Sequence, residues 1–132
     1  MRYRDAQLMV ERTLRFENGD ERWIEHRLSD DRLGRSLWLE IQDDRLTVYE
    51  RLPTGEPPSG EPEIVHEGVA FRLAEQGRAT YRSQERAGAG KQGEVEYVEY
   101  AAGDQRLAYE RFDAGPWELS LGRVVDPSDV AV

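Results

Sequence analysis

The sequence predicts an all-β domain, either an antiparallel sandwich or a partly open barrel, built from two related β-meanders. Three observations predict this fold. Apolar and polar residues alternate in short runs, as in strands whose successive side chains point to opposite faces. Turn signals recur about every eight to twelve residues. A proline-rich segment over residues 53–62 divides the chain into halves at about 6–52 and 63–125. The 132 residues are expected to form one domain.

The first half is expected to form a meander of four strands. Its first strand is expected over residues 8–16, where Arg12 interrupts a row of apolar side chains formed by Leu8, Val10, Leu14 and Phe16. Asn18 and Gly19 follow as a hairpin turn. The remaining strands of this half are expected at residues 22–28, 35–41 and 45–52.

The second half is expected to consist of six shorter strands. The prolines of residues 53–62 exclude both a helix and a central strand, so this segment is expected to be a loop. Turns are expected at Gln76-Gly77 and in the glycine-rich stretch 87–93, which lacks the spacing of a phosphate-binding loop. The strands are expected at residues 63–66, 69–74, 78–84, 94–101, 105–112 and 117–121.

Helix is the competing interpretation for two segments. Residues 4–15 and 67–86 are rich in Ala, Leu, Glu and Arg, which have good helix propensity. Gly68 and Gly77 interrupt the second segment, and alternation describes the first at least as well. We therefore expect strands in both.

Composition excludes several classes of function. The chain has no cysteine, which excludes disulfides, thiolate nucleophiles and Cys-ligated zinc or iron–sulfur centres. Its net charge of -9 and its interspersed Arg and Glu argue against a nucleic-acid partner. The N-terminal residues carry no apolar signal region, and no apolar run reaches membrane-spanning length. We expect a cytoplasmic acidic protein with no direct membrane insertion.

An internal repeat is the most informative pattern in the chain. Trp23-Ile24-Glu25-His26 returns as Tyr97-Val98-Glu99-Tyr100, a shift of 97 - 23 = 74 residues. Each copy is followed by a strand with Arg and Leu that ends in glutamate, at Glu40 and at Glu110. We predict that each half covers the apolar face of the other.

The repeat supplies the candidate ligand-binding residues Trp23, Glu25, Tyr97 and Glu99. Each glutamate lies two residues from an aromatic ring, on the same face of its strand. If the two faces converge, the resulting acidic and aromatic site suits a cation such as an organic amine. The alternative is that Glu25 and Glu99 pair across strands with arginines such as Arg35 and Arg106 and only fix the register.

Other chemistry receives less support from the sequence. A glycosidase-like pair would need two carboxylates about 5 to 10 Å apart with one raised pKa. No nucleophile motif is present, so no catalytic residue is assigned. His26 and His66 could hold a metal only if the fold brings them together, and we expect neither metal nor cofactor. Trp117 follows Gly115-Pro116 and is a candidate anchor for a partner, although Trp38, Phe112 and Trp117 also suit a core.

A series of weak motifs spans roughly residues 8–125 in a characteristic order. The motifs are Thr13-Leu14-Arg15-Phe16, Trp23-x-Glu25-His26-x-Leu28, Leu37-Trp38-Leu39-Glu40, Phe71-Arg72-Leu73, Ala79-x-Tyr81, Tyr97-x-Glu99-Tyr100, Leu107-x-Tyr109-Glu110-Arg111-Phe112 and Gly115-Pro116-Trp117-Glu118. In this order they resemble the bacterial family described as domain of unknown function 4178. The resemblance carries over no catalytic or binding residue.

The resemblance also implies a biological setting, because genes of this family occur near those of small membrane proteins, phage-shock-like envelope proteins and aminopropyltransferase-like enzymes. It implies an accessory role in envelope physiology. We therefore expect a non-catalytic protein-binding or adaptor module. The alternatives are a barrel that binds a cationic amine and, more remotely, a carboxylate-dependent hydrolase.

Overall fold

The computed structural model describes residues 2–3, 6–30, 35–86 and 88–131. Most of these residues form antiparallel strands, as the alternation predicts. Within these residues no helix is long and apolar enough to cross a membrane. The elements are β1 (Arg2–Tyr3), β2 (Ala6–Gln7), β3 (Met9–Asn18), β4 (Glu21–Asp30), β5 (Arg35–Gln42), β6 (Arg45–Arg51), β7 (Glu63–His66), β8 (Val69–Glu85), β9 (Gln92–Ala102), β10 (Gln105–Phe112), β11 (Trp117–Val125), the 3₁₀ turn η1 (Pro127–Asp129) and β12 (Val130–Ala131).

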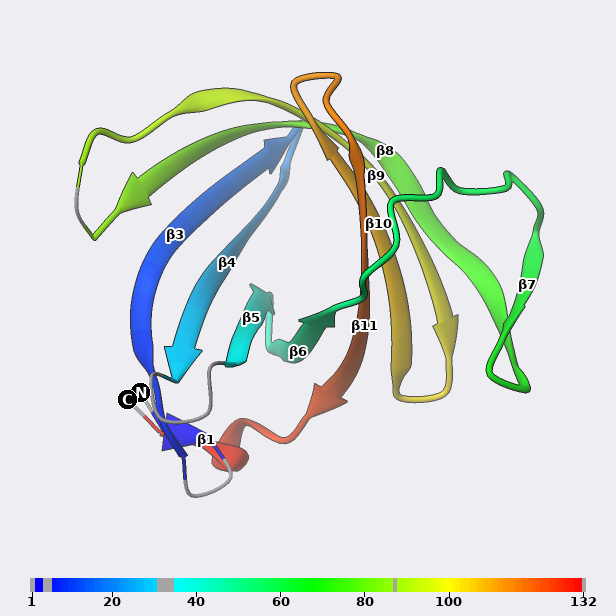
Figure 1. The fold of residues 1–132 in the computed structure, drawn as a ribbon, viewed down its shortest axis with the longest axis horizontal. Helices are drawn as coiled ribbons and strands as arrows, with labels where there is room; N and C mark the ends of the chain where they lie inside the picture. The colour runs from blue at the N-terminus through cyan, green and yellow to red at the C-terminus, as the bar shows by residue number, and fades with distance from the viewer. Residues whose placement is uncertain (1, 4–5, 31–34, 87, 132) are drawn as a thin grey trace.

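Eight strands close into an antiparallel barrel (Figure 1). Their order is β3-β4-β5-β6-β11-β10-β9-β8, and β8 pairs back with β3 to complete the circle. The all-β antiparallel prediction is confirmed, whereas the sandwich and the partly open barrel are wrong. The reason is the pairing of residues 12–17 with residues 80–85, which satisfies both strands that would otherwise be edges.

Two meanders make up the barrel, β3 to β6 from the first half and β8 to β11 from the second. They join through the β6–β11 and β3–β8 pairings. The structural equivalence of the two halves stays a prediction. The loop over residues 53–62 crosses from one meander to the other, and β7 with the start of β8 projects to one side of the barrel (Figure 1).

The turn expected at Gln76-Gly77 does not exist, because β8 runs without interruption through both residues. Gly77 lies opposite Tyr97 in the β8–β9 register. A Cβ atom at Gly77 would come within 3.0 Å of the Tyr97 hydroxyl oxygen. Glycine is therefore needed here for space rather than for a turn. Residues 4–15 and 67–86, for which helix was the competing interpretation, lie mainly in strands within the described part of the chain.

The apolar row expected along β3 is split by a β-bulge. The register with β4 shifts between Val10 and Arg12, which moves the following side chains to the other face. Leu8 and Val10 consequently join an apolar cluster with Leu28 and Leu39, whereas Leu14 and Phe16 belong to a different one. Arg12, which interrupts the row in the sequence, marks the place of the bulge.

Ring contacts between strands that are not neighbours identify the interior of the barrel. Trp23 on β4 makes an edge contact with Tyr97 on β9 at 5.4 Å between ring centroids. Phe16 on β3 lies 6.3 Å from Phe112 on β10. Such pairs can meet only across the lumen. The lumen therefore contains one apolar cluster, which consists of Leu14, Phe16, Trp23, Ala79, Tyr81 and Val95 with Trp38, Tyr97 and Phe112 packed against it.

A further apolar cluster involves β7, β8 and the outward residues of β9 to β11, with Phe71, Tyr100, Leu107 and Leu119 at its centre. The proline-rich loop is tied to this region. The Leu73 amide donates to the Pro62 carbonyl at 2.9 Å, and the Tyr100 hydroxyl donates to the Glu61 carbonyl at 2.7 Å. These outer contacts leave the lumen free for a different set of side chains.

Candidate functional site

The lumen carries a group of glutamates next to its aromatic side chains. Five of them line a cavity of about 30 Å³ that also has Trp23 and Tyr97 in its wall. This volume holds roughly two water molecules. The five residues, here called the acidic cluster, are Glu25 on β4, Glu40 on β5, Glu75 on β8, Glu99 on β9 and Glu110 on β10.

The structure places the four predicted ligand-binding residues, Trp23, Glu25, Tyr97 and Glu99, on this one cavity. Ligand binding by them stays a prediction. The prediction omitted Glu40, Glu75 and Glu110. The sequence contained a signal for Glu40 and Glu110, because each ends the strand that follows one copy of the repeat. Glu75 gave no such signal, since the β-bulge between Leu73 and Glu75 sets its direction.

Strand register brings like charges together within the cluster. Glu25 lies directly opposite Glu40 in the β4–β5 pair, and Glu75 lies opposite Glu99 in the β8–β9 pair. Glu25 and Glu40 are only 4% and 8% exposed. Like charges at directly opposite positions destabilise a sheet, and burial away from water adds to the cost. Register and packing alone therefore give no reason for this arrangement.

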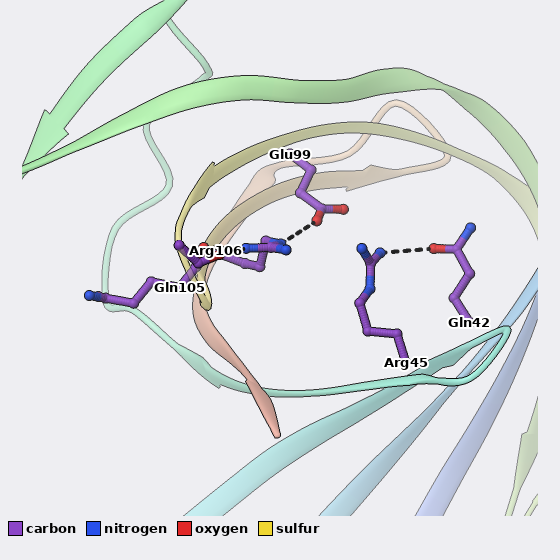
Figure 2. A network of polar contacts seen from close by, with 6 residues as sticks. Gln42, Arg45, Glu99, Gln105 and Arg106 are labelled. Atoms are coloured by element: carbon purple, nitrogen blue, oxygen red, sulfur yellow. Dashed lines mark hydrogen bonds and ion pairs between the residues drawn. The ribbon is translucent and has the colours of Figure 1, made fainter. Parts of the chain in front are cut away.

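Arginines partly balance the acidic cluster, as Figure 2 shows around Glu99. Arg106 Nε lies 3.3 Å from Glu99 Oε1, and the two side chains are 14% and 12% exposed. Arg106 also donates to the Gly103 carbonyl at 2.7 Å. Arg45 donates to Gln42 Oε1 at 3.4 Å and extends towards Glu99 (Figure 2). Glu99 therefore forms an ion pair with an arginine, as expected in the alternative to ligand binding. For Glu25 the expected cross-strand pair is wrong, because Glu25 lies opposite Glu40 in the β4–β5 register and Arg35 lies opposite Asp30. The side chain of Arg35 lies outside the described part of the chain.

A deeper chamber of about 10 Å³ adjoins the cavity and shares Glu25 and Glu110 with it. This volume is roughly that of one water molecule. The side chains of Glu25 and Glu110 reach this chamber from strands that are not neighbours in the barrel. The hydroxyl of Tyr49, a residue that is 3% exposed, has no hydrogen-bond partner among the described residues. Arg51 and Ser120 complete the polar part of the wall.

Burial raises the pKa values of the lumen carboxyls. Burial first, and then the charges of Glu110 and Glu40, raise the pKa of Glu25 well above its usual range. Burial and the neighbouring Glu99 raise the pKa of Glu40 to about 8. Burial and Glu118 raise the pKa of Glu110 to about 7, opposed by Arg51. The pKa of Glu99 is also raised by burial, although Arg45 and Arg106 oppose this.

The two histidines lie on different elements, β4 and β7. His26 Nδ1 is hydrogen-bonded to Thr13 Oγ1 at 2.9 Å, and the His66 ring makes an edge contact with Phe71. Within the described residues, no group of three or more His, Asp or Glu side chains has a metal-binding arrangement. Trp117 is half-buried, and the Arg111 guanidinium lies 5.3 Å from its ring centroid. Its role as a partner anchor stays a prediction.

Comparison with known proteins identifies the family. The sequence model of the family described as Domain of unknown function (DUF4178) matches residues 1–127. The chain belongs to this family. The resemblance seen in the ordered motifs is thereby confirmed. No solved structure matches the chain.

Curated relatives from mycobacteria are also similar to the chain. They include the uncharacterized protein Mb2628 of Mycobacterium bovis and the uncharacterized protein Rv2597 of Mycobacterium tuberculosis, each 31% identical over 137 residues. Each match covers 94% of this chain and 64% of the relative. The chain thus spans less than two thirds of the length of these relatives.

Proposed function

We propose that the barrel is a non-catalytic binding module whose lumen binds the ammonium group of a small organic amine. The observation that carries this proposal is the excess of carboxyl groups over arginines around the cavity. Glu25, Glu40, Glu75, Glu99 and Glu110 converge there from five strands. Within the described residues, Arg106 forms an ion pair with Glu99, whereas Arg51 forms its ion pair with Glu118, outside the cluster.

Charge balance supports a cationic ligand. An unpaired buried carboxylate is costly, so the excess must be neutralised by protons or by a cation. The cluster also has two aromatic side chains in its wall, Trp23 and Tyr97. Aromatic faces attract organic cations in addition to the attraction of the carboxylates. An amine satisfies both kinds of group.

The size of the cavity narrows the class of cation. About 30 Å³ can take an ammonium group in place of water but not a nitrogen that carries several methyl groups. A primary ammonium has three N–H donors, which suit several carboxyl acceptors at once. We therefore expect primary amines to bind and quaternary amines to be excluded.

The same geometry gives less support to the other two candidate functions. Large exposed apolar side chains within the described residues are Met9 and Val65, on strands β3 and β7, so no apolar patch for protein recognition is evident there. The cavity that Glu25 and Glu110 line is too small for a sugar ring between two carboxyls. An adaptor role, a protein partner and a cytoplasmic location stay predictions, and affinity capture would test the first two.

Calorimetric titration with putrescine and spermidine tests the proposal. We expect saturable binding of both amines, and no binding of tetramethylammonium at the same concentration. Replacing Glu99 by glutamine removes a lumen charge, so Glu99→Gln should weaken amine binding at least about tenfold, equivalent to about 1.4 kcal/mol.

The matched control is Glu94→Gln. Glu94 lies on the same strand β9 but is exposed, so its substitution should leave binding unchanged. Absence of any heat with millimolar putrescine and spermidine would overturn the proposal. Equal binding of tetramethylammonium would contradict the size argument.

A further inference from the structure

Two carboxyl groups line the deeper chamber. Glu25 on β4 and Glu110 on β10 belong to strands that are not neighbours in the barrel, so their side chains face each other across the lumen. Glu25 is 4% exposed. Two ionised carboxylates in a chamber of about 10 Å³ repel each other and offer only acceptors. One bound proton relieves this repulsion and supplies a donor.

The charges around this pair do not remove the need for that proton. Glu25 faces Glu40 from β5, Glu110 from β10 and Glu118 from β11, and it is opposite the apolar Leu14 of β3. The cation that acts on both members of the pair is Arg51 of β6. Arg51 already forms an ion pair with Glu118, with Nη1 to Oε1 at 3.2 Å. The carboxyls facing the pair thus outnumber the cations, which favours retention of a proton.

Tyr49 provides a second, independent observation. Its hydroxyl is buried and has no partner within the described residues, yet it lies in the wall of the same chamber. The carboxyls of Glu25, Glu40, Glu99 and Glu110 all act on this phenol electrostatically. Gly122 makes room for the ring, because a Cβ atom there would come within 2.5 Å of the Tyr49 Cδ1 and Cε1 atoms. A buried donor without a partner indicates that the chamber takes up a further polar species.

We propose that Glu25, Glu110 and Tyr49 form a proton-binding site in the barrel, which holds one exchangeable proton between the two carboxyls and has space for one water molecule beside Tyr49. Loss of this proton adds one negative charge to the lumen. The charge of the lumen is then set by the pH of the surroundings near neutrality. This site goes beyond the proposed amine site and does not require an amine.

Nuclear magnetic resonance of glutamate side-chain carboxyl carbons measures this site directly in the intact protein. We expect at least one carboxyl resonance of the native chain to titrate with a midpoint near or above pH 7, far from the usual value of about 4.3. Glu110→Gln should remove one such resonance. In Glu25→Gln, the introduced amide can donate to Glu110 without a shared proton, so the midpoint of Glu110 should fall by at least about one pH unit.

The native titration can overturn the proposal even if a variant does not fold, and the two variants distinguish this pair from Glu40, whose pKa is also raised. Midpoints below about pH 6 for every glutamate would overturn it. Retention of all high midpoints in both variants would overturn the assignment to this pair. Glu94→Gln, exposed on β9, serves as the control and should change no high midpoint. Failure of putrescine to bind would refute the amine site and leave this titration unaffected.

Discussion

Two clusters share the lumen of the barrel and differ in what they contribute. The apolar cluster of the lumen is here called the aromatic cluster. In it, Phe16 stacks on Trp23 at 5.2 Å between ring centroids with an interplanar angle of 6°, and Tyr81 makes an edge contact with Phe112 at 5.1 Å. These contacts bury apolar surface and stabilise the fold. The acidic cluster instead buries like charges, which costs stability. The comparison indicates that the aromatic cluster stabilises the barrel and that the acidic cluster does not contribute in the same way.

The two clusters also differ in what their side chains require when they are buried. Aromatic side chains need only close packing, which the barrel supplies through neighbouring rings. The carboxyls need protons, arginines or a bound cation, and the described arginines supply part of this. Conditions that change protonation should therefore act on the acidic cluster and leave the aromatic cluster unaffected.

The largest expected effect distinguishes the two clusters by mutation. Phe16 is 2% exposed, so Phe16→Ala leaves a large cavity and should lower the free energy of unfolding by about 3 to 5 kcal/mol. Glu40→Gln keeps the shape and removes an ionisable carboxyl, so it should change this free energy by less than about 1 kcal/mol or increase it. Urea denaturation measures both. Equal losses for the two variants would contradict the comparison.

An intermediate effect is expected at the ion pair in the lumen. Arg106→Met leaves Glu99 buried without its partner and should cost about 1 to 3 kcal/mol in the free energy of unfolding. The control is Arg22→Ala, which breaks the Arg22–Glu17 pair, whose side chains are 79% and 55% exposed. This variant should cost less than about 1 kcal/mol. Similar losses would show that burial of the Glu99 pair is without consequence.

The last expected effect is the dependence of stability on pH. The folded-state pKa values of Glu40, about 8, and Glu110, about 7, lie above the unfolded value. The folded protein therefore binds more protons, so this stabilisation is complete below about pH 4.5 and is lost as the pH rises through 7 to 8. Tm should fall between pH 5.5 and 8.5, and Glu40→Gln should make this fall smaller. A Tm that rises over this range would refute the raised pKa values.

Local patterns in the sequence were sufficient for the strands but not for the closure of the barrel. Alternation located β4, β5, β6, β10 and β11 because it reports which side chains share a face. The β3–β8 pairing joins segments more than sixty residues apart and has no local signal. The role of Gly77 was also misread, because a glycine beside a distant tyrosine has the same local pattern as a glycine in a turn.

The candidate site was predicted in part for the same reason. The repeat identified Trp23, Glu25, Tyr97 and Glu99, since each pair lies two residues apart on one strand face. It could not show that Glu110 meets Glu25, because the two strands contact only across the lumen. Nor could it distinguish Glu99, which has Arg106 as its partner, from Glu25, which faces a chamber lined by a second carboxyl.

The sequence by itself determined the all-β class, the order of the strands along the chain, the family and the face on which each repeated glutamate lies. Those properties depend on neighbouring residues and on the period of two. Only the tertiary structure decided that the sheet closes and that this face becomes the interior. Closure removes the carboxyls from water and brings them together, and this raises their pKa values, because desolvation and charge repulsion depend on three-dimensional proximity.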